Sequence, residues 1–186
     1  MDSLTSRIHI SIKRQELSLY QADILRKTYL IASAKNGIGQ LMGSECTPLG
    51  THRICEKIGD NAVKDSVFVA RQFTGEIYSE DLAKLNPDRD WILTRILWLE
   101  GLEVGFNQGD FIGGDETNNL NGAQRSIEQG DAISCDTRQR FIYIHGCPDS
   151  HSMQIPSSHG CIKMRNADII ELFDFVNTGT LVDIQQ

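Results

Sequence analysis

No stretch of this sequence stays apolar for the length that a membrane-spanning helix requires, so no membrane anchor is expected. The first residues, MDSLTSRIHISIKRQ, contain no apolar segment of signal-peptide length and no small-residue cleavage site. We therefore expect a cytoplasmic protein. The sequence also lacks a stripe rich in Lys and Arg, and its net charge is -7, so binding to nucleic acid is not expected.

Cysteine is scarce, and its number is odd. The sequence has five cysteines, scattered along the chain: Cys46, Cys55, Cys135, Cys147 and Cys161. A disulfide framework usually has an even and dense set of cysteines, whereas scattered thiols fit a reducing compartment. Biased tracts and linkers are missing too, so the whole chain, residues 1–186, is expected to form a single domain.

The apolar and polar residues that are present follow mainly the pattern of β-strands. Residues 8–19 alternate Ile and Leu with polar residues around a polar turn, which is typical of a hairpin. TYLIASA, a short run at residues 51–55, DSVFVARQF and WILTRILWLEGL are further expected strands, each as a single piece. RFIYIHG is a nearly continuous apolar run, as expected for a buried central strand.

One helix is expected late in the chain. After residue 165 the apolar residues Ile169, Leu172 and Phe173 fall on one helical face, and Asn166 is the expected N-cap. TLVDI then closes the chain as a strand. The predicted architecture is mainly β, a sandwich or barrel with one late α-helix.

A long polar insertion is expected at residues 107–138. The segment is rich in Gly and Asn, weakly periodic, and too long for an ordinary connection between elements. Loops of this kind are usually functional or irregular, so the segment is a candidate lid.

The chemistry-bearing side chains concentrate in residues 144–164, IHGCPDSHSMQIPSSHGCIKM, where His-Gly-Cys occurs twice. A metal site, a Cys147–Cys161 disulfide and a thiol nucleophile with its base are the three alternatives. The His-x-Cys spacing is unusual for zinc, and no acidic residue is placed to act as a metalloprotease base, so neither a metal nor a cofactor is expected. A disulfide conflicts with the reducing compartment. His151, in a Ser-rich loop, is expected to be a solvated residue rather than a ligand, and contact with substrate is the alternative.

The nucleophile interpretation fits the placement of the residues best. A catalytic thiol needs a nearby imidazole, which is oriented in turn by a third group. His145, at the end of the buried strand, is the candidate base, and Cys161, just before the helix, is the candidate nucleophile. Gly160 permits close backbone approach, so the amides of Gly160 and Cys161 are candidates for an oxyanion hole.

These motifs resemble a known family. His-Gly followed by SSHGCIKMRNADI resembles the signature of the YkuD family of L,D-transpeptidases. TPLGTHRI, ILTRILWLEGLEVGFN and DTRQRFIYIHG resemble further segments of that family, so the resemblance covers nearly the whole chain. It implies a YkuD-type β-sandwich or barrel in which Cys161 attacks the bond between meso-diaminopimelate and a terminal D-alanine.

The resemblance also implies roles for the neighbours of the thiol. His145 would be the base, with its ring oriented by the carbonyl of Gly146. His159 would support the pocket, and Ser158 with Gly160 would shape the turn before the nucleophile. Carbapenem β-lactams are expected to acylate the thiol.

Two positions depart from the family pattern. Lys163 stands where the family usually has Arg, and Lys keeps the charge but not the planar fork that grips a carboxylate. Arg165 is a candidate to compensate in substrate binding, and Arg140 is a candidate either for substrate binding or for the scaffold. Cys147 stands where relatives more often have a small hydroxylated residue, and its role is open between bystander and redox partner of Cys161.

The expected activity is that of a cysteine-dependent L,D-carboxypeptidase that removes the terminal D-alanine from peptidoglycan tetrapeptide fragments during recycling. This choice rests on the expected cytoplasmic location, because recycled tetrapeptides must lose D-alanine before reuse. An exported L,D-transpeptidase that forms 3-3 cross-links or attaches a lipoprotein is the alternative with the same chemistry. An inactive muropeptide-binding module is the alternative from another class.

Overall fold

The computed structural model describes residues 5–112 and 133–186. These residues form one mainly antiparallel sheet with the strand order β4-β10-β1-β2-β3-β9-β8-β7-β5-β6. The strands are β1 (Ser6–Ser11), β2 (Glu16–Gln21), β3 (Ile24–Ala32), β4 (Gly50–Ile58), β5 (Ser66–Val69), β6 (Gln72–Ile77), β7 (Ile92–Gly101), β8 (Tyr143–Cys147), β9 (Ile162–Arg165) and β10 (Leu181–Gln185).

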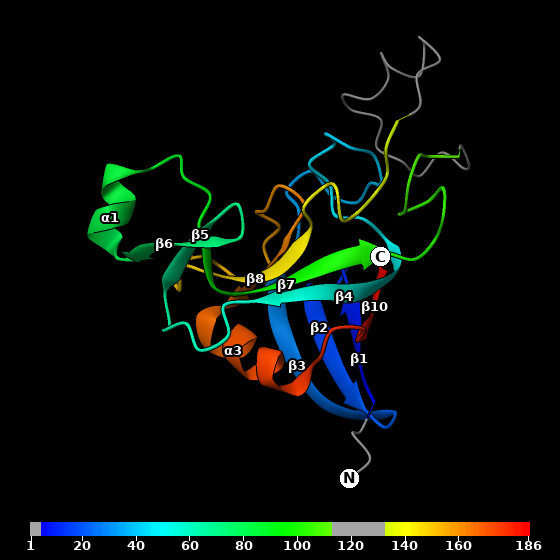
Figure 1. The fold of residues 1–186 in the computed structure, drawn as a ribbon, viewed down its shortest axis with the longest axis horizontal. Helices are drawn as coiled ribbons and strands as arrows, with labels where there is room; N and C mark the ends of the chain where they lie inside the picture. The colour runs from blue at the N-terminus through cyan, green and yellow to red at the C-terminus, as the bar shows by residue number, and fades with distance from the viewer. Residues whose placement is uncertain (1–4, 113–132) are drawn as a thin grey trace.

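The sheet closes on itself because β4 pairs with β7 as well as with β10. One edge of β7 pairs with β8, while its other edge pairs with β4 over residues 96–101 and with β5 over residues 92–93. Eight strands thus form a barrel, and β5, β6 and the short helix α1 (Glu80–Leu85) extend from one end of it (Figure 1). The predicted mainly β class is confirmed.

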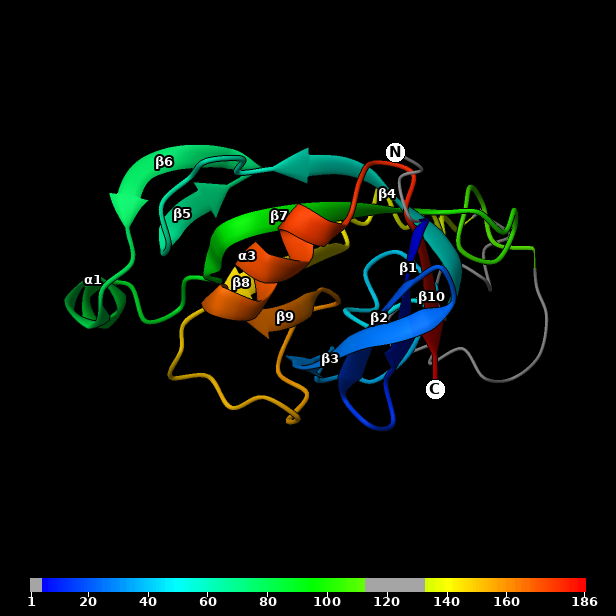
Figure 2. The same cartoon turned by 90° about the horizontal axis from the view of Figure 1, so that it is seen from below.

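The helix α3 (Asn166–Phe175) packs against β7, β8 and β9 (Figure 2). Its Ile169, Leu172 and Phe173 join the main apolar core, which also contains Ile144 of β8. Successive side chains of a strand point to opposite faces, so His145 and Tyr143 face away from this core. Among the described residues, no helix is long and apolar enough to cross a membrane.

Two strand predictions were wrong in their extent. The strand expected at residues 51–55 runs over Gly50–Ile58, because a bulge between Ile54 and Glu56 lets it follow β7. The DSVFVARQF run is a hairpin rather than one strand, since Ala70 and Arg71 form its turn with φ of 47° and 68°. Neither residue is the Gly or Asn that usually marks such a turn, so this turn could not be predicted from its residue types.

The predicted N-cap was also wrong. Arg165 occupies the N-cap position of α3, and Asn166 is the buried first residue of the helix. The Asn166 amide donates to the Cys147 carbonyl at 2.9 Å and to Asp65 Oδ1 at 2.8 Å, while its Oδ1 accepts from Thr94 Oγ1 at 2.6 Å. These tertiary hydrogen bonds take the side chain away from the capping position.

Most of the candidate lid at residues 107–138 lies outside the described residues, which omit 113–132. Its two flanks belong to the end of the barrel. Asn107 is buried, and its side-chain amide donates to the carbonyls of Leu49 and Thr51 at 3.1 Å. Thr137 Oγ1 in turn donates to the Asn107 carbonyl at 3.0 Å, which ties the second flank to the first.

Candidate active site

The parallel pairing of β8 with β9 brings the two His-Gly-Cys tripeptides to the same part of the sheet. Lys163 lies beside His145, and Ile162 lies beside Ile144. Cys161 directly precedes β9 and lies at the level of Tyr143. The sheet therefore places the candidate base in β8 and the candidate nucleophile directly before the neighbouring strand β9.

His145 is held in one tautomer. The imidazole is buried, and its Nδ1 lies 2.8 Å from the carbonyl oxygen of Gly146. A carbonyl can only accept, so Nδ1 carries the proton and Nε2 keeps its lone pair. Nε2 is buried and has no hydrogen-bond partner among the described residues. Burial lowers the pKa of His145, so the ring is neutral and ready to accept a proton at Nε2.

Gly146 is required by the space around it. A Cβ at this position would lie 2.4 Å from Asn166 Oδ1 and 2.7 Å from the Leu93 carbonyl oxygen, both closer than real Cβ contacts allow. The close approach of β7 and α3 fixes the peptide whose carbonyl orients His145. This geometry agrees with the role that the family resemblance implies for Gly146.

The Cys161 thiol is half-buried and lies against backbone groups. The Tyr143 N–H points at Sγ at 3.4 Å, and Sγ lies 3.5 Å from the Phe141 carbonyl oxygen. Burial raises the pKa of Cys161 to about 12, so the resting thiol is protonated. Sγ is not hydrogen-bonded to His145 Nε2, and such contacts commonly tighten only when substrate binds.

The turn before the nucleophile is closed by Ser158. Its hydroxyl donates to the Cys161 carbonyl at 2.5 Å and accepts from the Gly160 N–H at 3.2 Å. Gly160 has a φ of 131°, in the region that favours glycine. Because its amide is already bonded inside the turn, the geometry does not support the expected contribution of Gly160 to an oxyanion hole. The Tyr143 N–H is the amide that faces the sulfur.

Thr47 fixes this turn from the other side. The side chain is buried, and Oγ1 donates to the Gly160 carbonyl at 3.0 Å while it accepts from the Ala34 N–H at 3.0 Å. From the sequence, TPLG was noted only as part of a segment that resembles the family. The structure shows what its threonine does, which is to tie the nucleophile turn to the chain that leaves β3.

Two cavities meet beside the thiol. The thiol cavity, of about 450 Å³, is lined by Ala70, Arg71, Asp90, Ile92, Phe141, Tyr143, His159 and Cys161. The second, of about 350 Å³, is lined by residues that include Asp90, His151, His159 and Lys163, and we call it the charged cavity. Asp90 and His159 line both, so His159 lies where the resemblance places it, although its role stays a prediction.

Lys163 is buried in the wall of the charged cavity. Its Nζ donates to the Ser157 carbonyl at 3.3 Å and lies 3.8 Å from Asp90 Oδ1. Lys163 therefore places a cationic group at the cavity, and its predicted part in substrate binding stays a prediction. Asp90 could not be predicted from the sequence, because the aspartates of a polar turn such as NPDRD do not by themselves indicate a functional site.

The three other residues predicted for substrate binding, Ser158, Arg140 and Arg165, line neither cavity. The guanidinium of Arg140 donates to backbone carbonyls of the 39–46 segment at 2.6 to 3.1 Å, and burial lowers its pKa to about 10. The structure thus gives Arg140 the scaffold role. Arg165 is exposed and donates to the Asp149 carbonyl at 3.2 Å, because it points into the loop that follows β8. The predicted compensation of Lys163 by Arg165 stays a prediction.

His151 and Arg71 also line these cavities. His151 was expected to be solvated, but it is half-buried, lines the charged cavity, and has an Nδ1 with no hydrogen-bond partner in the described part of the chain. Arg71 donates to the Tyr143 hydroxyl at 3.0 Å and lies over the Phe141 ring at 4.9 Å. It gives the thiol cavity a cationic wall.

Cys147 takes no part in the site. It is buried with Ala32 and Met153, and its Sγ donates to the Met164 carbonyl at 3.4 Å. It pairs with Arg165, four residues beyond Cys161, a separation of roughly 13 Å along the strand. Disulfide formation requires Cα atoms within about 7 Å, so Cys147 is a bystander. Among the described residues, no group of three His, Cys, Asp or Glu is arranged to hold a metal ion.

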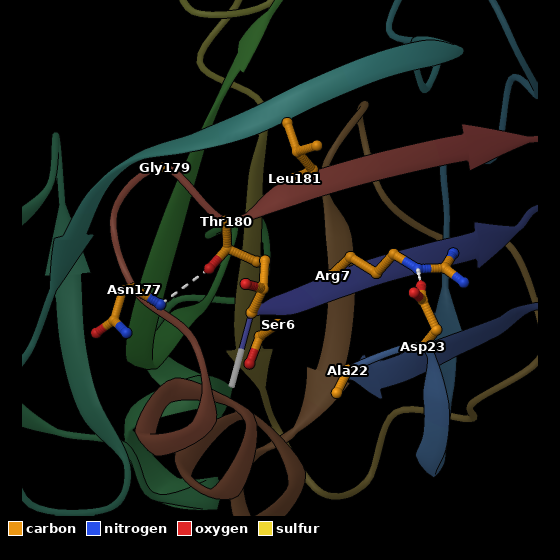
Figure 3. Close-up of a pocket in the computed structure, with 9 residues that line it drawn as sticks. Ser6, Arg7, Ala22, Asp23, Asn177, Gly179, Thr180 and Leu181 are labelled. Atoms are coloured by element: carbon orange, nitrogen blue, oxygen red, sulfur yellow. Dashed lines mark hydrogen bonds and ion pairs between the residues drawn. The ribbon is translucent and has the colours of Figure 1, made fainter. Parts of the chain in front are cut away.

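A third cavity, of about 320 Å³, lies where β1 and β10 begin and shares no lining residue with the thiol cavity (Figure 3). Its polar groups bond to one another: Arg7 Nε donates to Asp23 at 3.2 Å, and the Asn177 N–H donates to Thr180 Oγ1 at 3.0 Å. Its lining residues include neither a cysteine nor a histidine, so we place the chemistry at Cys161.

Comparisons with known proteins agree on the fold. At 13% identity, L,D-transpeptidase 3 from Mycobacterium tuberculosis in complex with a faropenem-derived adduct has a TM-score of 0.52, over 98% of this chain and 61% of that one. The L,D-transpeptidase from Enterococcus faecium has a TM-score of 0.51 at 15% sequence identity, and the match covers 97% of this chain and 50% of that one. LdtMt1 in complex with imipenem has a TM-score of 0.51 at 13% sequence identity, and the match covers 98% of this chain and 59% of that one.

This chain therefore spans about 50 to 61% of the length of those solved chains. No curated protein matches it. The family of L,D-transpeptidase catalytic domains called YkuD matches over residues 5–184, which is nearly the whole chain. The chain thus belongs to the YkuD family of L,D-transpeptidase catalytic domains.

Proposed function

We propose that this protein is an L,D-carboxypeptidase that removes the terminal D-alanine from peptidoglycan tetrapeptides. The observation that carries the proposal is the neutral His145, whose Nδ1 is bonded to the Gly146 carbonyl and whose Nε2 is left without a partner near the Cys161 turn. This arrangement supplies a base for a thiol that is itself protonated at rest.

The reaction follows from these groups. Cys161 Sγ attacks the carbonyl carbon of diaminopimelate in its bond to D-alanine, and His145 Nε2 takes the thiol proton. When the C–N bond breaks, His145 returns the proton to the leaving amine, and free D-alanine departs from a thioester on Cys161. Water then attacks the thioester, with His145 again as the base, and releases the tripeptide. The Tyr143 N–H, which faces Sγ, stabilises negative charge that develops there.

Hydrolysis is proposed over transpeptidation because of the space beside the thiol. The charged cavity has about 350 Å³ and is lined largely by polar and charged side chains, which suits water or a small polar acceptor. Formation of 3-3 cross-links or attachment of a lipoprotein requires an amine from a much larger acceptor. This transpeptidase activity is the second candidate, since it passes through the same thioester.

Covalent inhibition by β-lactams belongs to the proposal. Two of the solved L,D-transpeptidases with this fold are described with imipenem and with a faropenem-derived adduct. We propose that carbapenems acylate Cys161, the thiol that opens into the larger of the two cavities.

A cytoplasmic location and a role in recycling complete the proposal. All five cysteines are free thiols in this structure, and persistent free thiols fit a reducing compartment. Fractionation of cells that express the native protein tests the location, and recovery of the protein from the periplasm would remove the recycling role.

The activity is tested by mass spectrometry of products from a soluble tetrapeptide, with and without an added D-amino acid. We expect tripeptide and free D-alanine as the main products, and none of either with Cys161→Ala. Predominant peptide dimers or exchange products would make the protein a transpeptidase. Binding of the tetrapeptide without any product would make it a muropeptide-binding module.

A further inference from the structure

A further cavity lies between the β5–β6 hairpin and the loop that leads into it, and we call it the hairpin cavity. Its volume is about 510 Å³, within the range of roughly 300–1,000 Å³ that small-ligand sites occupy. Residues 58–63 line it together with residues that include Phe68, Arg71 and Phe73 of the hairpin. Arg71 also lines the thiol cavity, so a ligand that extends from Cys161 past Arg71 enters the hairpin cavity.

The side chain of Arg71 is held in place where the two cavities meet. Its Nη1 donates to the Tyr143 hydroxyl at 3.0 Å, and its guanidinium carbon lies 4.5 Å from the centre of the Trp98 ring and 4.9 Å from that of Phe141. The ion pairs of the described residues do not include Arg71. A guanidinium has five N–H donors, so most of those of Arg71 stay available to polar groups of a ligand.

An exposed aromatic ring forms the apolar wall of the hairpin cavity. Phe73 is 52% exposed, and its ring centroid lies 6.1 Å from that of the buried Phe68. Val63, which lines the same cavity, is 62% exposed. Single exposed apolar residues are ordinary, whereas several that line one cavity are typical of a binding site. We therefore expect part of the ligand to be apolar.

Polar groups lie in the wall of the same cavity. Asp60 and Asn61 are exposed, and Asn61 Nδ2 donates to Asp60 Oδ2 at 3.0 Å. A carboxylate has about four acceptor positions, and among the described residues Asp60 forms no ion pair, so it keeps acceptor capacity. An entirely apolar partner would cover these groups without bonding to them, which is costly. The cavity therefore favours a ligand with an apolar face and hydroxyl groups at its edge.

We infer that the hairpin cavity binds the N-acetylated sugar of a peptidoglycan fragment, with the C–H face of the pyranose ring on Phe73 and its hydroxyl groups on Asp60. The inference rests on the proposed function, because that function places the peptide of the same fragment at Cys161. In a tetrapeptide stem, three residues separate the sugar from the reacting bond, and three extended residues span at most about 11 Å. This reach fits a sugar in the cavity that shares Arg71 with the thiol cavity.

Turnover of two matched substrates tests the inference. kcat/KM is measured for a free tetrapeptide and for the same tetrapeptide on N-acetylglucosaminyl-N-acetylmuramic acid, and the readout is the ratio of the second value to the first. We expect a ratio of at least about ten for the wild-type protein. Phe73→Ala and Asp60→Ala are each expected to lower this ratio by about fivefold.

The chain offers a matched control for each variant. Ile77→Ala removes an exposed apolar side chain from the same strand as Phe73, and Asp81→Ala removes an exposed carboxylate from α1. Neither Ile77 nor Asp81 lines the hairpin cavity, so both controls are expected to keep the wild-type ratio. Each protein is compared with itself on two substrates, so a general loss of active protein leaves the ratio unchanged.

A ratio near one for the wild-type protein, or a ratio that Phe73→Ala and Asp60→Ala leave unchanged, would overturn the inference. Dissociation of an oligomer in sedimentation of Phe73→Ala, with an unchanged ratio, would assign this surface to a second copy of the chain and overturn it too. Release of D-alanine from the free tetrapeptide supports the proposed function whatever the ratio is. If neither substrate is turned over, the proposed function fails, and the ratio of dissociation constants of Cys161→Ala for the free and the sugar-bearing tripeptide decides the inference by the same criterion.

Discussion

At the scale of single residues, the site depends on two groups that burial keeps neutral. Burial lowers the pKa of His145 and raises that of Cys161, and each shift disfavours the charged form. The resting pair is therefore imidazole and thiol rather than imidazolium and thiolate. The proton moves only when Sγ attacks, which requires Nε2 to be unprotonated and correctly aimed.

This neutrality predicts how the thiol reacts with a simple electrophile. Because the pKa of Cys161 is raised to about 12, alkylation by iodoacetamide is expected to be slow at neutral pH and to accelerate up to at least about pH 10. Peptide mapping follows Cys161 separately from the other four cysteines. A rate that reaches a plateau near neutral pH would show a preformed thiolate and contradict the neutral pair.

Gly146→Ala is expected to damage both stability and catalysis. The new Cβ would overlap Asn166 Oδ1 and the Leu93 carbonyl, and overpacking of this kind costs about 1–3 kcal/mol in the free energy of unfolding. The displaced peptide also misdirects His145, so kcat is expected to fall at least about tenfold.

Gly75→Ala is the matched control for Gly146→Ala. Gly75 has a φ of 87° and lies in β6, the last strand in the order of the sheet. No atom lies within 4 Å of the Cβ that alanine would add there. Gly75→Ala is expected to lower stability and leave kcat unchanged. Denaturant unfolding and steady-state kinetics measure the two effects, and an unchanged kcat for Gly146→Ala would contradict the role of this peptide.

At the scale of elements, the nucleophile turn is held from outside its own strand by Thr47. Thr47→Val keeps the shape of the side chain but removes the hydroxyl bonded to the Gly160 carbonyl and to the Ala34 N–H. We expect a loss of about 1–3 kcal/mol in the free energy of unfolding and a lower kcat.

Thr47→Ser retains the hydroxyl and is expected to restore most of both quantities. Urea denaturation and turnover of the tetrapeptide provide the measurements. Equal behaviour of the Val and Ser variants would show that packing, and not the hydrogen bonds, fixes the turn.

The elements also show which parts of the fold could be predicted from the sequence. The alternation around Ile8 and Ile10, the apolar run at residues 142–144 and the helical period after residue 165 predicted local structure, because each depends on burial of one face. The closure of the barrel by β4 and β7 joins segments distant in sequence, and no local pattern encodes that pairing.

In the site too, some residues could be predicted from the sequence and others could not. The repeated His-Gly-Cys and the family resemblance pointed to His145 in β8 and to Cys161, which directly precedes the neighbouring strand β9. Asp90 and the buried Nδ1 of His151 were missed, because only the folded chain brings them to Lys163. Arg140 was a candidate for substrate binding or for the scaffold, and its guanidinium donates to the carbonyls of Gln40 and Cys46.

At the scale of the whole molecule, a buried histidine couples stability to pH. His52 is buried in β4, with Nδ1 2.9 Å from the Gly50 carbonyl oxygen and Nε2 3.2 Å from Thr137 Oγ1. Burial lowers the pKa of His52 from 6.5 to about 4. Below pH 6.5 the unfolded chain binds a proton that the folded chain does not, so stability falls as the pH falls.

The expected loss between pH 6.5 and pH 4 is on the order of 3 kcal/mol from this residue. Urea unfolding at several pH values measures it, and His52→Asn is expected to flatten the dependence. His9→Gln is the control for replacing a histidine, because His9 is partly exposed and lies in β1, which β10 separates from β4. Equal pH dependence for wild type and His52→Asn would contradict this account.

The central claim, that Cys161 forms the thioester, is tested most directly by acid quench of the enzyme with a tetrapeptide at early times, followed by peptide mapping by mass spectrometry. The account predicts a tripeptidyl group on the peptide that contains Cys161, none on Cys147, and none in Cys161→Ala. Labelling of another cysteine, or product formation by Cys161→Ala, would contradict it.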